Sequence, residues 1–264
     1  MGLFGKLFEK KSCDICGGDI GLLGNRKLED GNLCKNCAAK LSPWFSERRS
    51  STVAQIQEQL DYREKNKEAV ANFNTTSTLG NYTKVLLDED NRKFLVTSAS
   101  NLREANPDVL DYSQVTGCKL DIDESRSELK REDAEGKEVS YNPPRYEYEY
   151  DFYIVINVNH PYFDTIRFKI NRSSIEVTPP VNRPGANATT NIAGFARNSS
   201  VEFRETEQTG KEIVSALTGA RQQVRDEAAA ANAPKIAVTC PFCSANTIPD
   251  AMGRCEYCGG SVNG

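Results

Sequence analysis

The sequence predicts an α+β protein with several domains, in which a small cysteine-rich module lies at each end of an antiparallel β domain. Three observations support this prediction. Eight of the nine cysteines form Cys-x-x-Cys pairs near the ends of the 264-residue chain. The even-numbered residues from Tyr146 to Val158 are all aromatic or aliphatic, which is typical of a strand with one buried face. An amphipathic helix pattern follows the last strand, as in a sheet closed by a helix.

Composition and charge disfavour several classes of protein. The chain has 33 Lys and Arg against 37 Asp and Glu, a net charge of −4, so it is not a polycation made for nucleic acid. It has no apolar run that could cross a membrane, and Lys6 interrupts any signal peptide. We therefore expect a soluble, cytoplasmic protein. Because His160 is the sole histidine and no phosphate-binding glycine motif is present, we expect no enzyme activity, catalytic residue or small-molecule substrate.

The spacing of the cysteines favours metal binding. The first two pairs are separated by 17 residues and the last two by 11, so a short hairpin can bring each set of four sulfurs together. Disulfides and free thiols remain as alternatives, although nothing indicates an oxidising compartment. Pairing within each cluster costs less loop-closure entropy than pairing across the chain. The predicted ligands are Cys13, Cys16, Cys34 and Cys37 in one site and Cys240, Cys243, Cys255 and Cys258 in the other.

Four protein sulfurs fill a tetrahedral shell and leave no position for water or substrate, so both predicted sites are structural. Such a site accepts zinc or iron, and Zn²⁺ is the default assignment. Each Zn²⁺ with four thiolates carries a charge of about −2, which moves the formal charge of the chain to roughly −8. The ninth cysteine, Cys118, shares one face of a predicted strand with Leu120 and Ile122, and we interpret it as a small buried apolar residue rather than a reactive thiol.

The two modules resemble different zinc folds. Residues 1–50 combine a knuckle, a hairpin with a predicted turn at Glu29–Asn32, and a ligand pair that runs into the start of a helix at Cys37–Leu41, which resembles a treble clef. Residues 240–264 contain two knuckles with no helix after the second, which resembles a short zinc ribbon.

The chain between the modules is expected to hold most of the secondary structure. Residues 51–73 predict a helix that begins with a capping box at Thr52–Gln55 and acts as a spacer or docks on a neighbour, without contributing to a core. Residues 74–225 predict a β domain, or partial barrel, with a closing helix that begins at Ser199, and residues 226–239 a linker. Within the β domain we expect strands at 82–88, 93–97, 115–123, 145–158 and 166–170. We further expect a protruding hairpin or loop at 123–140, where 11 of 18 residues are charged, and a flexible loop at 179–200.

Two resemblances accompany this pattern. The hairpin at Tyr82, the approach Pro107-Asp-Val-Leu-Asp-Tyr-Ser-Gln-Val115 and the terminal helix resemble the bacterial pleckstrin-homology-like (PH-like) fold. The segments Cys13-Asp-Ile-Cys16, Gly21-Leu-Leu-Gly-Asn-Arg-Lys-Leu-Glu-Asp-Gly31, Leu33-Cys-Lys-Asn-Cys37 and Leu41-Ser-Pro-Trp-Phe45 resemble an uncharacterised four-cysteine domain that opens many bacterial proteins. The second resemblance implies a zinc site and this order of domains, and it does not imply a substrate.

Three functions compete on this basis. The preferred interpretation is a non-enzymatic adaptor or scaffold that mediates protein–protein interaction. The first alternative is a peripheral protein at the inner face of the membrane that uses its N-terminal segment and the PH-like domain, because Leu3, Phe4, Leu7 and Phe8 predict one apolar helical face opposite lysines. The second alternative is nucleic-acid binding, with Arg26, Lys27, Lys35, Arg48 and Arg49 as a local patch. The last 39 residues disfavour it because they hold two basic and four acidic side chains.

Overall fold

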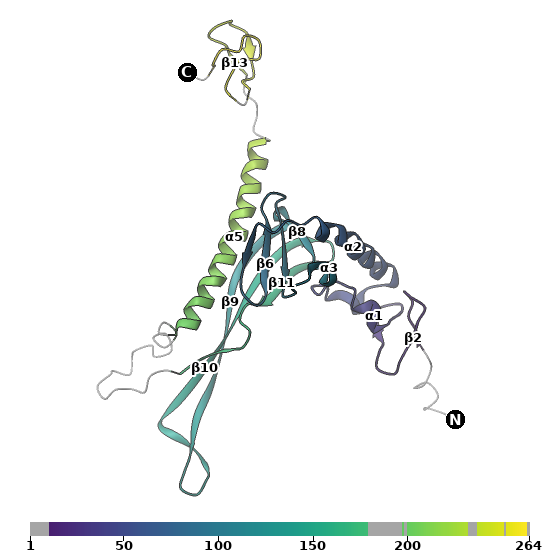
Figure 1. Ribbon diagram of the computed structural model, residues 1–264, viewed down its shortest axis with the longest axis vertical. Helices are drawn as coiled ribbons and strands as arrows, with labels where there is room; N and C mark the ends of the chain where they lie inside the picture. Colours follow the sequence, from purple (N-terminus) through teal and green to yellow (C-terminus); the bar gives the residue numbers. More distant parts are fainter. Residues whose placement is uncertain (1–10, 179–196, 198–199, 232–236, 251, 263–264) are drawn as a thin grey trace, which may run out of the picture. The chain divides into compact units, whose positions relative to one another are not determined.

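The computed structural model describes residues 11–178, 197, 200–231, 237–250 and 252–262, and it confirms the predicted α+β class (Figure 1). The chain divides into two compact units, residues 1–221 and 222–264. The predicted apolar face at residues 3–8 and nearly all of the predicted loop at 179–200 lie outside the described residues. In the described part, no helix is both long and apolar enough to span a bilayer.

Two short hairpins and a single helical turn open the first unit. The predicted turn at Glu29–Asn32 is confirmed, because the Leu28 N–H donates to the Gly31 carbonyl at 2.9 Å. The second ligand pair does lie at the start of a helix, but this start comes earlier than predicted, because Cys34 is the N-cap residue and the helix ends at Ala38. The elements are β1 (Lys11–Ser12), β2 (Asp19–Ile20), β3 (Arg26–Lys27), β4 (Asn32–Leu33), α1 (Lys35–Ala38) and η2 (Glu47–Ser50).

Helix α2 (Val53–Ala71) starts at the predicted capping box, in which the Thr52 side chain accepts from the Gln55 N–H and the Gln55 side chain accepts from the Thr52 N–H. Ile56 and Leu60 are buried in the same apolar cluster as the first four cysteines. The helix therefore docks, and the expectation that it adds nothing to a core is wrong, because its first half completes the core of the N-terminal module.

Two antiparallel sheets follow α2. The first is a four-stranded meander in the order β5-β6-β7-β8, and its inner strands carry fully buried side chains such as Val85, Phe94 and Leu95. The strand predicted at 82–88 begins at Lys84, and the one at 93–97 is found as predicted. The elements are β5 (Ser77–Leu79), β6 (Lys84–Asp88), β7 (Lys93–Thr97), α3 (Leu102–Ala105), β8 (Val109–Asp111) and η3 (Tyr112–Gln114).

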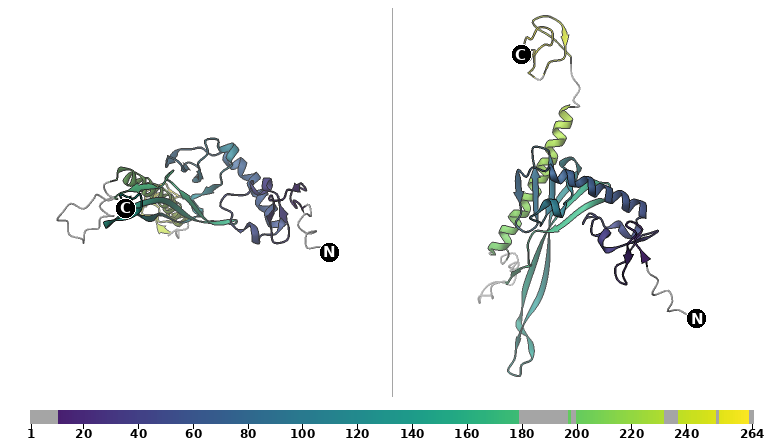
Figure 2. Two further views of the ribbon diagram at one scale, coloured as in Figure 1. Left: turned by 90° about the horizontal axis from the view of Figure 1, so that it is seen from below. Right: turned by 45° about the vertical axis from the view of Figure 1, so that its right-hand side comes forward.

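A long antiparallel pair, β9 (Val115–Glu132) and β10 (Glu138–His160), dominates the second sheet. The predicted strands at 115–123 and 145–158 are both longer than expected, because the charged segment between them continues the pairing as a two-stranded ribbon (Figures 1 and 2). The buried face of β10 begins at Tyr150, whereas Tyr146 is half-buried and lies under the Arg126 guanidinium at 4.4 Å from its ring centre.

Strands β11 (Phe163–Lys169) and β12 (Ile175–Val177) pair with successive segments of β10. The pairing of β10 with β11 after the turn at Pro161 places the Lys169 Nζ 2.6 Å from an Asp151 carboxylate oxygen. Both side chains are partly exposed, so this pair fixes register more than it stabilises the fold.

Helix α5 (Val201–Ala231) follows the last strand. Its Phe203 ring packs edge-on against Tyr150 and Phe152 of β10, at centroid distances of 4.9 and 5.0 Å, and Ile213 and Leu217 are also buried. The Ser200 hydroxyl accepts from the Phe203 N–H at 3.2 Å; the predicted capping residue Ser199 lies outside the described residues. The helix continues to residue 231, so the first six residues of the predicted 226–239 linker are helical.

The second unit contains the C-terminal part of the chain from residue 222. Its small module is built from one hairpin, β13 (Val238–Thr239) and β14 (Asn246–Thr247), and from an isolated bridge between Arg254 and Ser261. Its described residues show no helix after the last cysteine, as the ribbon-like prediction required.

Candidate metal centres

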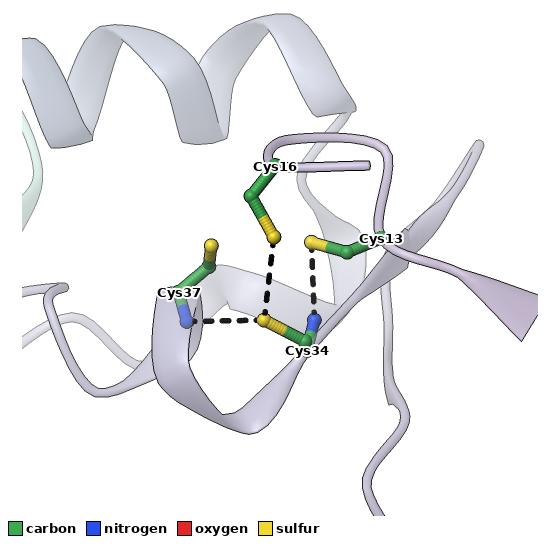
Figure 3. A group of neighbouring side chains, drawn as sticks. All are labelled: Cys13, Cys16, Cys34 and Cys37. Carbon is green, nitrogen blue, oxygen red and sulfur yellow. Dashed lines mark hydrogen bonds between the residues drawn. The ribbon is translucent and has the colours of Figure 1, made fainter. Parts of the chain in front are cut away.

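The first cysteine pair sits on a backbone knuckle that follows β1. The Gly17 N–H donates to the Cys13 carbonyl at 2.8 Å, and the Cys13 N–H donates to the Gly18 carbonyl at 2.9 Å. Gly17 has φ +71°, a conformation that a side chain disfavours. This turn aims the sulfurs of Cys13 and Cys16 toward the same point (Figure 3).

The second pair is held by the start of α1. Cys34 is the N-cap residue, and its Sγ accepts from the Cys37 N–H at 3.3 Å. The Cys34 N–H in turn donates to the Cys13 Sγ at 3.3 Å, so the backbone connects the two pairs directly (Figure 3). A knuckle facing a helix start is the arrangement that the treble-clef resemblance implied.

The distances between the sulfurs fit a tetrahedral ion. All four Sγ atoms lie within 4.8 Å of one another, and those of Cys16 and Cys34 are 3.8 Å apart. A tetrahedron with metal–sulfur bonds of about 2.3 Å has sulfur–sulfur edges of about 3.8 Å. A disulfide needs about 2.05 Å, and all nine cysteines are free thiols in the structure. The geometry therefore suits an ion and not a covalent bridge.

The electrostatics of this cluster also fit a cation. Burial acts to raise the pKa of Cys13, but backbone N–H groups of Cys34, Cys16 and Ile15 stabilise its thiolate and lower the pKa to about 6. Burial and the neighbouring cysteine side chains raise the pKa of Cys37. Four thiolates therefore repel one another unless a dication neutralises them.

The C-terminal cluster repeats the knuckle twice. The Ser244 N–H donates to the Cys240 carbonyl at 2.9 Å, and the Gly259 N–H donates to the Cys255 carbonyl at 2.8 Å. Ser244 has φ +56° and Gly259 has φ +69°, so both knuckles turn through the left-handed region.

The sulfur distances of the second cluster match those of the first. The Sγ atoms of Cys240 and Cys258 are 3.6 Å apart, and those of Cys243 and Cys255 are 3.7 Å apart. Burial acts to raise the pKa of Cys255, but backbone N–H groups of Cys258 and Tyr257 lower it to about 6. Two equivalent tetrahedral donor sets are therefore present.

The structure thus brings together all eight predicted ligands, in the two predicted groups. Cys118 belongs to neither group and is half-buried rather than fully buried, and burial raises its pKa to about 12. Sequence reasoning missed the backbone N–H groups that donate to the sulfurs. The glycines directly after two of the pairs, Gly17 and Gly259, are the signal that could have identified them.

Fold and sites together define an α+β protein with a four-cysteine cluster in each of two small modules. Residues 11–59 match the family model described as "Domain of unknown function (DUF4428)", which agrees with the four-cysteine domain that the sequence resembles and extends into α2. Neither the comparison with curated proteins nor that with solved structures found a match.

Proposed function

We propose that the protein is a non-enzymatic scaffold whose two terminal modules are each folded around one Zn²⁺ and which holds protein partners together. The observation that carries the proposal is the closed sulfur geometry, with 3.8 Å between Cys16 and Cys34 and 3.7 Å between Cys243 and Cys255. A shell of four protein sulfurs leaves no position at which a substrate or water could be activated. Zinc is preferred over iron because tetrahedral thiolate sites without redox chemistry are typical of structural zinc.

The environment of His160 supports a non-catalytic interpretation. Its ring stacks on Phe163 at a centroid distance of 4.1 Å, and its Nδ1 accepts from the Tyr162 N–H at 3.3 Å. Burial lowers the pKa of this histidine. These contacts give the side chain a packing role at the β10–β11 turn.

Exposed apolar side chains on the C-terminal module support the scaffold role. Phe242 is 71% exposed, Tyr257 67% and Met252 78%. Phe242 and Tyr257 occupy the x positions of the two knuckles, so a metal-bound module would present both rings on a rigid frame. Large apolar side chains gathered on so small a module are typical of protein-binding surfaces.

The central domain is proposed to be PH-like. A four-stranded antiparallel meander, a second antiparallel sheet and one closing helix support this assignment. Analogy of fold alone is a weak argument for function, so no ligand is transferred with it. The nucleic-acid alternative stays disfavoured by the charge of the C-terminal residues, and the apolar face at residues 3–8 lies outside the described residues.

Metal analysis of the purified full chain tests the zinc assignment. We expect about two Zn²⁺ per chain, about one in Cys34→Ser or Cys255→Ser, and an unchanged content in Cys118→Ser, the matched control. X-ray absorption should show sulfur-only coordination. One ion or none in the intact chain, iron in place of zinc, or an oxygen ligand would contradict the assignment.

Affinity capture tests the scaffold role separately. We expect the full chain to retain a protein partner that the double variant Phe242→Ser/Tyr257→Ser loses while keeping its zinc. Identical capture by both proteins would argue against this surface.

A further inference from the structure

A tight turn in the first module exposes two neighbouring leucines. The turn Gly21–Gly24 lies between β2 and β3, and the Gly24 N–H closes it on the Gly21 carbonyl at 2.9 Å. Leu22 is 82% exposed and Leu23 is 93% exposed. The hydrogen bond fixes the turn, so both leucines are held outward at its corners.

This exposure contrasts with the rest of the module. Leu28 and Leu33 are completely buried, as is Ile56 of α2. Leu22 and Leu23 stay in contact with water and do not gain the free energy that burial gives the other leucines. Binding to an apolar surface that buries both side chains would therefore be favourable.

Basic side chains come from β3, which follows the leucine turn, and from η2. The Arg26 guanidinium donates to the Leu23 carbonyl at 3.4 Å, and the Arg48 guanidinium donates to the Lys27 carbonyl at 2.7 Å. Burial and the positive charges of Arg26 and Arg49 lower the pKa of Arg48. We call these residues the basic cluster: Arg26, Lys27, Arg48 and Arg49.

The basic cluster has no acidic partner among the ion pairs of the described residues. Two carboxylates of the same module are already engaged by backbone groups. The Asp30 carboxylate accepts from the Val53 N–H at 2.8 Å, and the Asp14 carboxylate accepts from the Asn32 N–H at 2.6 Å. The cations are therefore available to an external anionic surface.

We propose that this tip docks the protein on an anionic lipid bilayer. Leu22 and Leu23 enter the boundary between headgroups and acyl chains, and the basic cluster binds lipid phosphates and carboxylates. A bilayer offers both an apolar layer and negative charge, whereas nucleic acid offers the charge alone. The proposal goes beyond the scaffold function and requires only that the first module is folded.

The sequence holds a second apolar and basic segment. Residues 1–10, which lie outside the described residues, contain Leu3, Phe4, Leu7, Phe8, Lys6 and Lys10. Stable membrane binding usually takes two such signals.

Vesicle co-sedimentation of the zinc-loaded full chain tests the proposal. The probes are phosphatidylcholine vesicles with and without about 30% phosphatidylserine. We expect binding to the anionic vesicles alone, at least about tenfold weaker binding for Leu22→Ser/Leu23→Ser, and about tenfold weaker binding for Lys27→Gln/Arg49→Gln. Matched controls remove exposed residues elsewhere, Tyr82→Ser for the apolar pair and Lys65→Gln/Arg103→Gln for the charges, and should bind like the wild type.

The outcomes separate the explanations. No binding of the wild type to anionic vesicles, or equal binding by the leucine variant, overturns the proposal. Binding to an oligonucleotide that needs the basic cluster and not the leucines, without vesicle binding, assigns the surface to nucleic acid instead. Zinc content measured on the same samples reports on the scaffold proposal independently, because the substituted residues are not ligands.

Discussion

The buried carboxylate of Asp108 should be among the most sensitive positions for stability. Its side chain is completely buried and accepts from Arg63 at 2.6 Å, from the Ser42 hydroxyl at 2.7 Å and from the Tyr62 hydroxyl at 3.0 Å. Ser42 belongs to the first metal module, Arg63 and Tyr62 lie on α2, and Asp108 directly precedes β8. One carboxylate therefore connects three parts of the first unit.

The substitution Asp108→Asn keeps the shape of the side chain and removes its charge. The Arg63 side chain is only 7% exposed, and its remaining acceptors, the carbonyl oxygens of Lys40 and Asn106 and the amide oxygen of the new side chain, would all be neutral. Removing one partner of a buried ion pair costs about 3–5 kcal/mol, because the other charge stays buried and uncompensated. We expect a loss of this size in the free energy of unfolding.

Urea denaturation of the zinc-loaded chain, followed by circular dichroism, measures this loss. The control is Glu64→Gln, which breaks the exposed pair with Lys67 (2.6 Å, side chains 63% and 56% exposed) and should cost no more than about 0.5 kcal/mol. In the double variant with Arg63→Met, the two losses should not add. A loss below about 1 kcal/mol for Asp108→Asn would refute the assigned role of the pair.

Two further predictions concern the first sheet. Burial acts to raise the pKa of Asp88, but hydrogen bonds from Asn74 and Asn91 lower it below its ordinary value. Its stabilising contribution is therefore complete above a pH of about 4 and is lost as the pH falls through the folded-state pKa. The difference in urea midpoint between wild type and Asp88→Asn should shrink in acid, and a constant difference would contradict this. Gly80 has φ +87°, and an added Cβ would lie 2.7 Å from the Thr83 carbonyl oxygen, so Gly80→Ala should cost about 1–3 kcal/mol. In the helical control Gly219→Ala, where no atom lies within 4 Å, thermal unfolding should instead show a gain of about 0.5–1 kcal/mol.

The cysteine clusters could be predicted because the four cysteines of each cluster are close together in the sequence. The 17 and 11 residues between the pairs suit hairpins, and each hairpin brought its four sulfurs together. The long β9–β10 ribbon was harder to predict. A segment with 11 charged residues in 18 is excluded from a core, but a paired ribbon and a loop are both compatible with that composition.

Interactions between distant residues were not predictable from sequence patterns. Arg63 lies in a charged stretch that is typical of an exposed helix, and nothing local indicates that it is buried against a residue 45 positions away. The exposure of Leu22 and Leu23 was not predicted either, because leucine side chains are expected to be buried. The glycines on both sides of the leucines were the signal for a turn.

The position of α2 explains why the first metal module and the sheets should respond differently to loss of the ion. The apolar cluster of the module contains Cys13, Cys37, Ile56 and Leu60, so its largest aliphatic contributions come partly from the helix. A core this small stabilises little by itself, so an ion bound by the four cysteines would supply much of the remaining free energy. The sheets have their own buried residues, such as Phe94 and Ile154, outside that cluster. The first half of α2 therefore belongs to the core of the first module. The same helix contacts the sheets through the carboxylate of Asp108, through the hydrogen bond from the Val109 N–H to Asn66, and through the Tyr62 ring against His160.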